Sequence, residues 1–436
     1  MRILAFTGGA GTMYCGSCLR DNALAAELLA KGHDVVLTPV YTPTRTDERN
    51  VSGAQVFFGG ISVYLEQHAP LFRYTPRFLD QLWDSNWALR LATKRQIKVD
   101  PKSLGELTVS MLRGENGFQK KEIGKLLDWL RSEPRFDVVN LPYALLLGLA
   151  GPLKRALNVP ICCTLQGEDL FLDGLGEPYR SQSLTLIRLA AEDVDAFLPV
   201  SQYYAHYMPS YLGIRQSKMR LAPLGINVEG YTPRAHEQSG PFTIGFLARL
   251  APEKGLHVLC DAYQRFRAMS RGTSARLLVA GYLAPEHAPY LNDLTRRMHA
   301  AGLGSEFEYR GELDRPGKIA FLQSLDVMSV PATYPEPKGM FLFEAMASGV
   351  PVVQPRRGAF PEILEKTGGG ILVDAADPDA LAQAFRQLQN EPALRSALGE
   401  AGAAGVRAHY TVGHMAETVE RIYAEVTRRA HALPAV

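Results

Sequence analysis

The sequence has few of the features that mark membrane, secreted or nucleic-acid-binding proteins. Its 436 residues include no apolar run near the roughly 18 residues that span a bilayer as a helix. The N-terminal run becomes glycine-rich at Gly8, too early for a secretion signal. Five cysteines are an odd number for a disulfide framework, and a net charge of +2 gives no field that would recruit nucleic acid. We therefore expect a reduced, cytoplasmic protein, with peripheral association at the inner face of the membrane as an open alternative.

The apolar pattern alternates between strand-like and helix-like segments. A strand at 2–7 leads through Gly8 and Gly9 to a helix at 19–30 and a strand at 34–39, and similar units follow from 118 onward. We predict an α/β protein with two Rossmann-like domains whose parallel sheets face a central cleft. The predicted segments are a first domain at 1–232, a linker at 233–241, a second domain at 242–410, and a C-terminal helix at 411–436.

Two glutamates separated by seven residues, Glu336 and Glu344, form the central motif. It lies between two short apolar runs that read as strands, and residues 341–347 read as a buried helix. Gly339 would allow a ligand to approach the N-terminus of this helix, where free N–H groups favour anions. On the residues alone, the alternative is a helix-capping acid and a solvated loop acid.

The motif resembles the signature of retaining glycosyltransferases of family 4, the glycosyl transferases group 1, which have the GT-B fold. Glu336, Gly339, Glu344 and the later Gly349 fall where that family has them. A second match is the loop 249–255, where family members have an arginine and a lysine directed at the diphosphate of a nucleotide-sugar donor. The resemblance implies two Rossmann-like domains of the GT-B type. It also implies that the last helix, at 411–436, crosses back onto the first domain.

The resemblance also implies a donor site. Arg249 and Lys254 would stabilise the leaving diphosphate without a metal ion, Glu336 would hold the donor sugar, and Glu344 would hold the ribose. We assign catalytic roles to Arg249, Lys254 and Glu336. The full set of predicted donor-binding residues is Gly9, Arg249, Lys254, Arg310, Gly311, Glu336, Gly339, Met340, Phe341 and Glu344.

No metal site and no cofactor are expected beyond the nucleoside-diphosphate sugar, which is a co-substrate. Asp193 and Asp195 have the spacing of a metal-binding pair, but they precede a strand instead of following one. On the acceptor side we predict contacts from Gly11, Gln166 and Asp169. Many family members have a histidine where this chain has Gln166, and glutamine cannot carry a proton charge. Asp169 has a helix-capping role as its alternative.

Two features of the first domain stay open. Cys15 and Cys18 have C-x2-C spacing, which suits either a redox pair or a small-residue loop, since no further ligands complete a zinc site. Within 48–120, Trp83 and Trp87 alternate with basic residues. That pattern suits an acceptor-binding or membrane-surface patch, or ordinary amphipathic helices with solvated faces.

The activity implied by the resemblance is transfer of a sugar from a nucleoside-diphosphate sugar to a hydroxyl acceptor, with retention at the anomeric carbon. The acceptor would be a glycan, a lipid-linked molecule or a small molecule, as in cell-envelope or polysaccharide biosynthesis. Nucleic acid is not an expected partner. Two alternatives are a nucleotide-sugar epimerase on the same fold and a binding protein that has kept the donor site without transfer.

Overall fold

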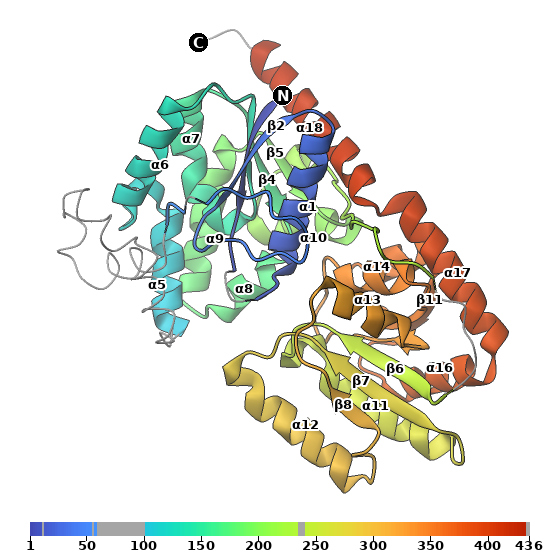
Figure 1. The fold of residues 1–436 in the computed structure, drawn as a ribbon. Coiled ribbons are helices and arrows are strands. Elements are labelled where there is room, and N and C mark those ends of the chain that lie inside the picture. The colour runs from blue at the N-terminus through green and yellow to red at the C-terminus, as the bar shows by residue number, and fades with distance from the viewer. Residues whose placement is uncertain (11–12, 55, 59–100, 234–239, 433–436) are drawn as a thin grey trace. The chain divides into compact units, whose positions relative to one another are not determined.

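The computed structural model describes residues 1–10, 13–54, 56–58, 101–233 and 240–432. The predicted patch around Trp83 and Trp87 and the predicted acceptor residue Gly11 lie outside these ranges. The chain forms two compact units, which are considered separately (Figure 1). One unit consists of Met1–Pro223 together with Ala416–Val436, and the other of Leu224–Met415.

The first unit is built on a parallel sheet of five strands in the order β2-β1-β3-β4-β5. Its strands are β1 (Arg2–Thr7), β2 (Asp34–Pro39), β3 (Val138–Leu141), β4 (Ile161–Leu165) and β5 (Ala196–Pro199). Its helices are α1 (Gly16–Ala30), α5 (Pro101–Leu112), α6 (Lys120–Ser132), α7 (Ala150–Leu157), α8 (Glu168–Gly174), α9 (Tyr179–Ala190) and α10 (Gln202–Leu212). The register aligns Leu4 of β1 with Val36 of β2 and with Val139 of β3.

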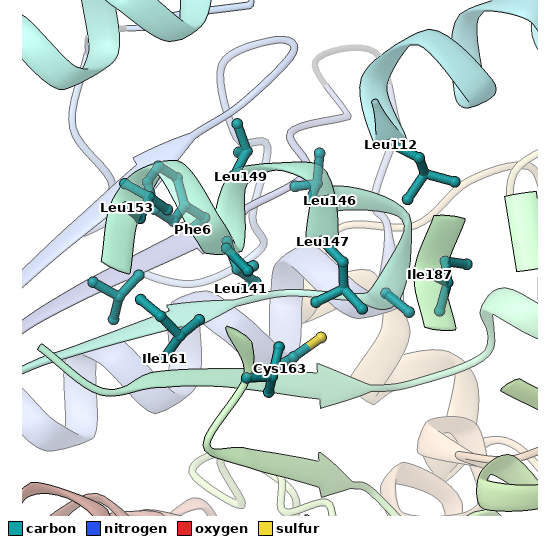
Figure 2. Packing of buried hydrophobic residues seen from close by; sticks show 14 of the residues in the cluster. Phe6, Leu112, Leu141, Leu146, Leu147, Leu149, Leu153, Ile161, Cys163 and Ile187 are labelled. Atoms are coloured by element: carbon teal, nitrogen blue, oxygen red, sulfur yellow. The ribbon is translucent and has the colours of Figure 1, made fainter. Parts of the chain in front are cut away.

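The core of this unit lies where the helices cover the sheet (Figure 2). Every residue of β3, β4 and β5 is buried, as expected for parallel strands covered on both faces. Phe6 and Ile161 from the strands pack in one cluster with Leu147 and Leu153 from the helical layer. Each such side chain stabilises the fold by about 1.5–3 kcal/mol. The continuous burial explains why these strands read as mainly apolar runs in the sequence, with Asn140 and Thr164 as buried polar exceptions.

The second unit contains a parallel sheet of six strands in the order β11-β10-β9-β6-β7-β8. The strands are β6 (Phe242–Leu247), β7 (Ala275–Ala280), β8 (Phe307–Tyr309), β9 (Val327–Met328), β10 (Val352–Pro355) and β11 (Gly370–Val373). The helices are α11 (Leu256–Met269), α12 (Ala288–Ala300), α13 (Arg315–Gln323), α14 (Met340–Ala347), α15 (Phe360–Thr367), α16 (Pro378–Asn390) and α17 (Pro392–His409). The prediction of two α/β domains with parallel sheets is confirmed.

The strand order of the second unit reverses between β6 and β9, which pair through Ile244 with Val327 and Gly245 with Met328. In open α/β sheets, ligands bind outside the carboxyl ends of the strands at such a reversal. The loops that follow β6 and β9 are therefore the natural position for a site, and they carry Lys254 and Glu336.

The boundary between the units lies ahead of the linker predicted at 233–241. Ile226 belongs to the second unit because its N–H donates to the carbonyl of Tyr410 at 2.9 Å and its own carbonyl accepts from Val412 at 2.8 Å. The last helix, α18 (Val412–Ala432), enters the first unit at Ala416. There Glu425 pairs with Arg220 at 3.2 Å. No helix in the described part of the chain is long and apolar enough to cross a bilayer.

Candidate functional site

Two loops meet at the strand reversal of the second unit. The N–H of Thr333, in the loop after β9, donates to the carbonyl of Glu253 in the loop after β6 at 2.9 Å. Gly255 makes the approach possible, because a Cβ at this position would lie 2.0 Å from the carbonyl oxygen of Pro331. Its φ of 79° is also a conformation that other residues rarely adopt. The glycine thus fixes how closely Lys254 and Glu336 approach.

Gly255→Ala is expected to destabilise the protein by about 3 kcal/mol or more, because it adds a backbone clash to a strained φ. Gly272→Ala is the matched control, since Gly272 has a φ of 85° with no atom within 4 Å of an added Cβ. The control should cost only about 1 kcal/mol, from the conformation alone. Urea unfolding of both variants measures the difference, and equal losses would contradict the close approach of the two loops.

Glu336 lies at the centre of the first of two charged clusters. Its Oε2 lies 2.5 Å from Nζ of Lys254 and also accepts a hydrogen bond from the hydroxyl of Tyr334. Nζ of Lys254 donates to the same hydroxyl at 2.7 Å. Burial alone would raise the pKa of Glu336, but the charge and hydrogen bond of Lys254 and the hydroxyl of Tyr334 lower this pKa to about 2. Glu336 is therefore a buried carboxylate that stays ionised.

Glu344 lies in the second cluster, on helix α14. Its Oε1 lies 2.5 Å from Nζ of Lys318, on α13, and accepts from the hydroxyl of Tyr231 at 3.3 Å. Each glutamate of the motif is thus held by one lysine and one tyrosine. The sequence singled out Glu336, Glu344 and Lys254, but Lys318 and the two tyrosines were missed.

The other residues predicted for this part of the donor site are Gly339, Met340, Phe341 and Arg249. Gly339 has a φ of 64° and precedes α14. The ring of Phe341, in the first turn of α14, has its centroid 6.0 Å from Nζ of Lys254, and Met340 is the first residue of that helix. Arg249 is exposed and pairs with Glu253 of its own loop. Lys254, Glu336 and the start of α14 therefore lie together, whereas the side chain of Arg249 is exposed to solvent.

Arg310 and Gly311 lie at the carboxyl ends of β7 and β8. The carbonyl of Gly311 accepts from the N–H of Gly281 at 2.8 Å. The guanidinium of Arg310 pairs with Glu308 at 2.9 Å, so its side chain is engaged on the same strand. The backbone groups of Arg310 and Gly311 lie at the carboxyl end of the sheet, as Lys254 does. This position suits donor contacts through main-chain N–H and carbonyl groups.

In the first unit, Gly9 also has a conformation that requires glycine. Its φ is 73°, and a Cβ would lie 1.8 Å from the carbonyl oxygen of Thr42. Gly9 follows β1 at the strand reversal between β1 and β3. It therefore lies at the corresponding edge of the first sheet.

Gln166 and Asp169 lie at the carboxyl end of β4. Nε2 of Gln166 donates to the carbonyl of Pro142 at 2.8 Å, whereas its buried Oε1 has no hydrogen-bond partner among the described residues. Asp169 accepts from the hydroxyl of Tyr204 at 2.7 Å, and burial raises the pKa of its carboxyl. Glu168, which the sequence did not single out, accepts from the N–H groups of Ala144 and Gln166 at 3.0 and 2.8 Å. Both acids are thus engaged in hydrogen bonds, and Gln166 is bonded to the loop that follows β3.

Two other features of the first unit were singled out by their spacing. A hydrogen bond with Cys15 and burial raise the pKa of the Cys18 thiol, so Cys18 is not the thiolate-forming member of the pair. Asp195 accepts from the N–H of Ile161 at 2.8 Å and pairs with Lys154. Within the described ranges, no group of three or more His, Cys, Asp or Glu side chains is placed to hold a metal ion.

Comparison with known families finds two matches. The family described as "Glycosyl transferases group 1" matches residues 231–404, and "Glycosyltransferase Family 4" matches residues 107–229. Together the two matched ranges cover about two thirds of the chain, including most of the second unit and about half of the first.

Two curated relatives carry related names. A phosphatidyl-myo-inositol mannosyltransferase of Mycobacterium leprae is 34% identical over 208 residues, which are 47% of this chain and 53% of that protein. A GDP-mannose-dependent monoacylated alpha-(1-6)-phosphatidylinositol monomannoside mannosyltransferase of Corynebacterium glutamicum is 28% identical, over 63% of this chain and 72% of that protein. The chain thus spans about half of the length of the first relative.

A solved structure extends the likeness to the whole fold. HepE of Anabaena, in complex with UDP and glucose, superposes with a TM-score of 0.67 at 15% identity. The superposition covers 97% of this chain and 99% of that one. At this identity the match shows a shared fold, and it confirms the predicted architecture.

Proposed function

Because the chain belongs to the group 1 glycosyltransferases of family 4, we propose that it transfers a sugar from a nucleoside-diphosphate sugar to a hydroxyl acceptor. The observation that carries the proposal is the cluster of Lys254, Tyr334 and Glu336 at the strand reversal of the second unit. It places a cation beside a buried, ionised carboxylate at the edge where α/β sheets bind nucleotides. A diphosphate would bind to Lys254 and to the N-terminus of α14, and sugar hydroxyls would donate to Glu336.

The transfer proceeds with retention at the anomeric carbon. The bond between that carbon and the diphosphate oxygen breaks, with its electron pair going to the diphosphate. The acceptor oxygen attacks from the same face, and its proton passes to the leaving phosphate oxygen. Lys254 and Arg249 stabilise the developing charge. Glu336 is held by Lys254 and Tyr334, so its oxygens serve to orient the sugar and not to attack it.

The acceptor is a hydroxyl group of a cyclitol, a sugar or a lipid-linked molecule. The curated relatives are named for transfer to phosphatidylinositol and its mannosides, which supports an acceptor of the cell envelope. The solved structure with UDP and glucose supports a nucleotide-sugar donor. The protein would then work in the cytoplasm, at the inner face of the membrane when its acceptor is a lipid.

A thermal-shift screen of UDP-, GDP- and ADP-sugars tests the donor site. A ligand at 100 times its dissociation constant should add about 2.7 kcal/mol of stability. The stabilising donor is then incubated without an acceptor. Slow release of the diphosphate supports a transferase, a changed sugar supports the epimerase alternative, and binding without either reaction supports a binding protein.

Transfer is expected to survive EDTA, because cationic side chains replace a metal ion at the diphosphate in this proposal. The measurement compares initial rates in buffer, in EDTA, and in EDTA followed by Mg²⁺ or Mn²⁺. Activity that disappears with EDTA and returns with either ion would contradict a diphosphate held by Arg249 and Lys254 alone.

A further inference from the structure

We infer that Tyr334 is a positioning residue of the donor site, where its hydroxyl fixes Lys254 and Glu336 in one arrangement. The inference rests on the proposed function, because it assigns to Tyr334 a part in the same site. Tyr334 would not touch the reacting atoms. It would act through the two charged side chains that do contact the donor.

The hydrogen bonds around the hydroxyl can all form at once. The ammonium of Lys254 donates to the oxygen of Tyr334 at 2.7 Å, and the hydroxyl of Tyr334 donates to Oε2 of Glu336. The ammonium also donates directly to Oε2 of Glu336 at 2.5 Å. An ammonium has three N–H groups, and two are assigned in this way. The direction of the third N–H is then fixed, and it can meet a diphosphate oxygen without loss of the other two bonds.

The segment around Tyr334 is anchored on both sides. The preceding residue, Thr333, donates its N–H to the carbonyl of Glu253, and the carbonyl of Glu336 accepts from the N–H of Ala359 at 2.9 Å. The ammonium lies beyond the hydroxyl end of the ring, with Nζ of Lys254 4.9 Å from the ring centroid of Tyr334. Because the segment is held on both sides, the hydroxyl of Tyr334 has a fixed position. This position orients the side chains of Lys254 and Glu336.

Three groups facing Glu336 keep it ionised: Lys254, Tyr334 and Lys338. Lys338 contributes its charge and a backbone N–H at 3.3 Å from Oε1. When a diphosphate competes for Lys254, the lysine's attraction for Glu336 weakens. The hydroxyl of Tyr334 remains as a neutral donor that does not compete for the diphosphate. Its contribution should therefore be largest in the donor complex, when the sugar is being transferred.

The test compares Tyr334→Phe with Tyr263→Phe in the full chain. Tyr263 is a matched control, because its hydroxyl donates to Oε2 of Glu306 at 2.6 Å and Arg267 donates to the same oxygen at 2.8 Å. This arrangement repeats the chemistry of the Glu336 cluster in the same unit. It lies at the other end of the sheet, since Glu306 precedes β8.

Tyr334→Phe should lower kcat roughly 10-fold or more, with a smaller change in KM for the donor. The loss of its hydrogen bond should raise the pKa of Glu336, so the acid limb of the kcat profile should move to higher pH. Tyr263→Phe should leave kcat, KM and the pH profile unchanged. The comparison is made by measuring kcat, KM and the pH profile of wild type and both variants, with the donor identified by thermal shift.

Three outcomes would separate the inference from the proposed function. If wild type transfers sugar and Tyr334→Phe keeps its kcat and pH profile, the positioning role is wrong while the proposed function stands. If both tyrosine variants lose activity equally, the role of Tyr334 is structural and the inference also fails. If wild type transfers no sugar from any donor, the proposed function fails, and the inference that depends on it fails as well.

Discussion

Lys254→Ala is expected to lower the rate of sugar transfer roughly 10²-fold or more and also to destabilise the fold, whereas Arg249→Ala should lower only the rate. Both cations are proposed to stabilise the departing diphosphate. Lys254 also neutralises Glu336, whose side chain is only 3% exposed. Removing the lysine leaves a buried carboxylate without its cation, at a cost of about 2–3 kcal/mol. Arg249 is exposed and pairs with Glu253, so its loss should change stability by less than about 1 kcal/mol.

Steady-state kinetics and urea unfolding of the two variants measure the two effects separately. Lys254→Arg is a useful further variant, because it restores the charge while changing the direction of its donors. It should recover stability better than rate. Near-normal transfer in both alanine variants would remove the proposed diphosphate site. Unchanged stability in Lys254→Ala would mean that Glu336 does not depend on the lysine.

The sequence pointed to the charged residues of the two clusters more readily than to the residues that hold them. Glu336, Gly339 and Glu344 form a motif of fixed spacing, and Lys254 belongs to a loop that directly follows a recognisable strand. Such local patterns can be read because the residues are close in the chain. Tyr334 was within reach, since it lies two residues before Glu336, but no periodicity distinguishes it from other loop residues.

Lys318 and Tyr231 could not be predicted from local pattern. Tyr231 is 113 residues from Glu344, and it fell at the edge of a predicted linker. Lys318 lies on a helix where an exposed lysine is the usual expectation. The chain divides into its two units earlier than the predicted linker, for the same reason. Ile226 and Thr411 form a β-bridge, and no sequence pattern reveals a pairing between segments so far apart. Contacts between distant segments depend on how the sheet is assembled, whereas the strands themselves follow from runs of buried apolar residues.

Glu336→Gln and Glu344→Gln should impair sugar transfer through different kinetic constants. Glu344 is proposed to hold the ribose, which does not react, so its loss should appear mainly in KM for the donor. Glu336 is proposed to lie against the sugar, whose geometry changes as the bond breaks, so its loss should lower kcat more than it raises KM. Glu306→Gln is a control for both, because Glu306 also pairs with an arginine and a tyrosine, at the far end of the sheet.

Calorimetry with the free nucleoside diphosphate distinguishes the two roles without any chemistry. Glu344→Gln should weaken binding of the diphosphate roughly 10-fold, since it removes an acceptor for the ribose hydroxyls. Glu336→Gln should leave that affinity nearly intact or increase it, because Lys254, freed from the carboxylate charge, has a stronger attraction for phosphate. Equal losses in the two variants would mean that the glutamates only support the loops. Suppose that Glu336→Gln increases the affinity for the diphosphate and also lowers kcat. The ion pair of Lys254 and Glu336 would then be shown to weaken donor binding while it orients the sugar.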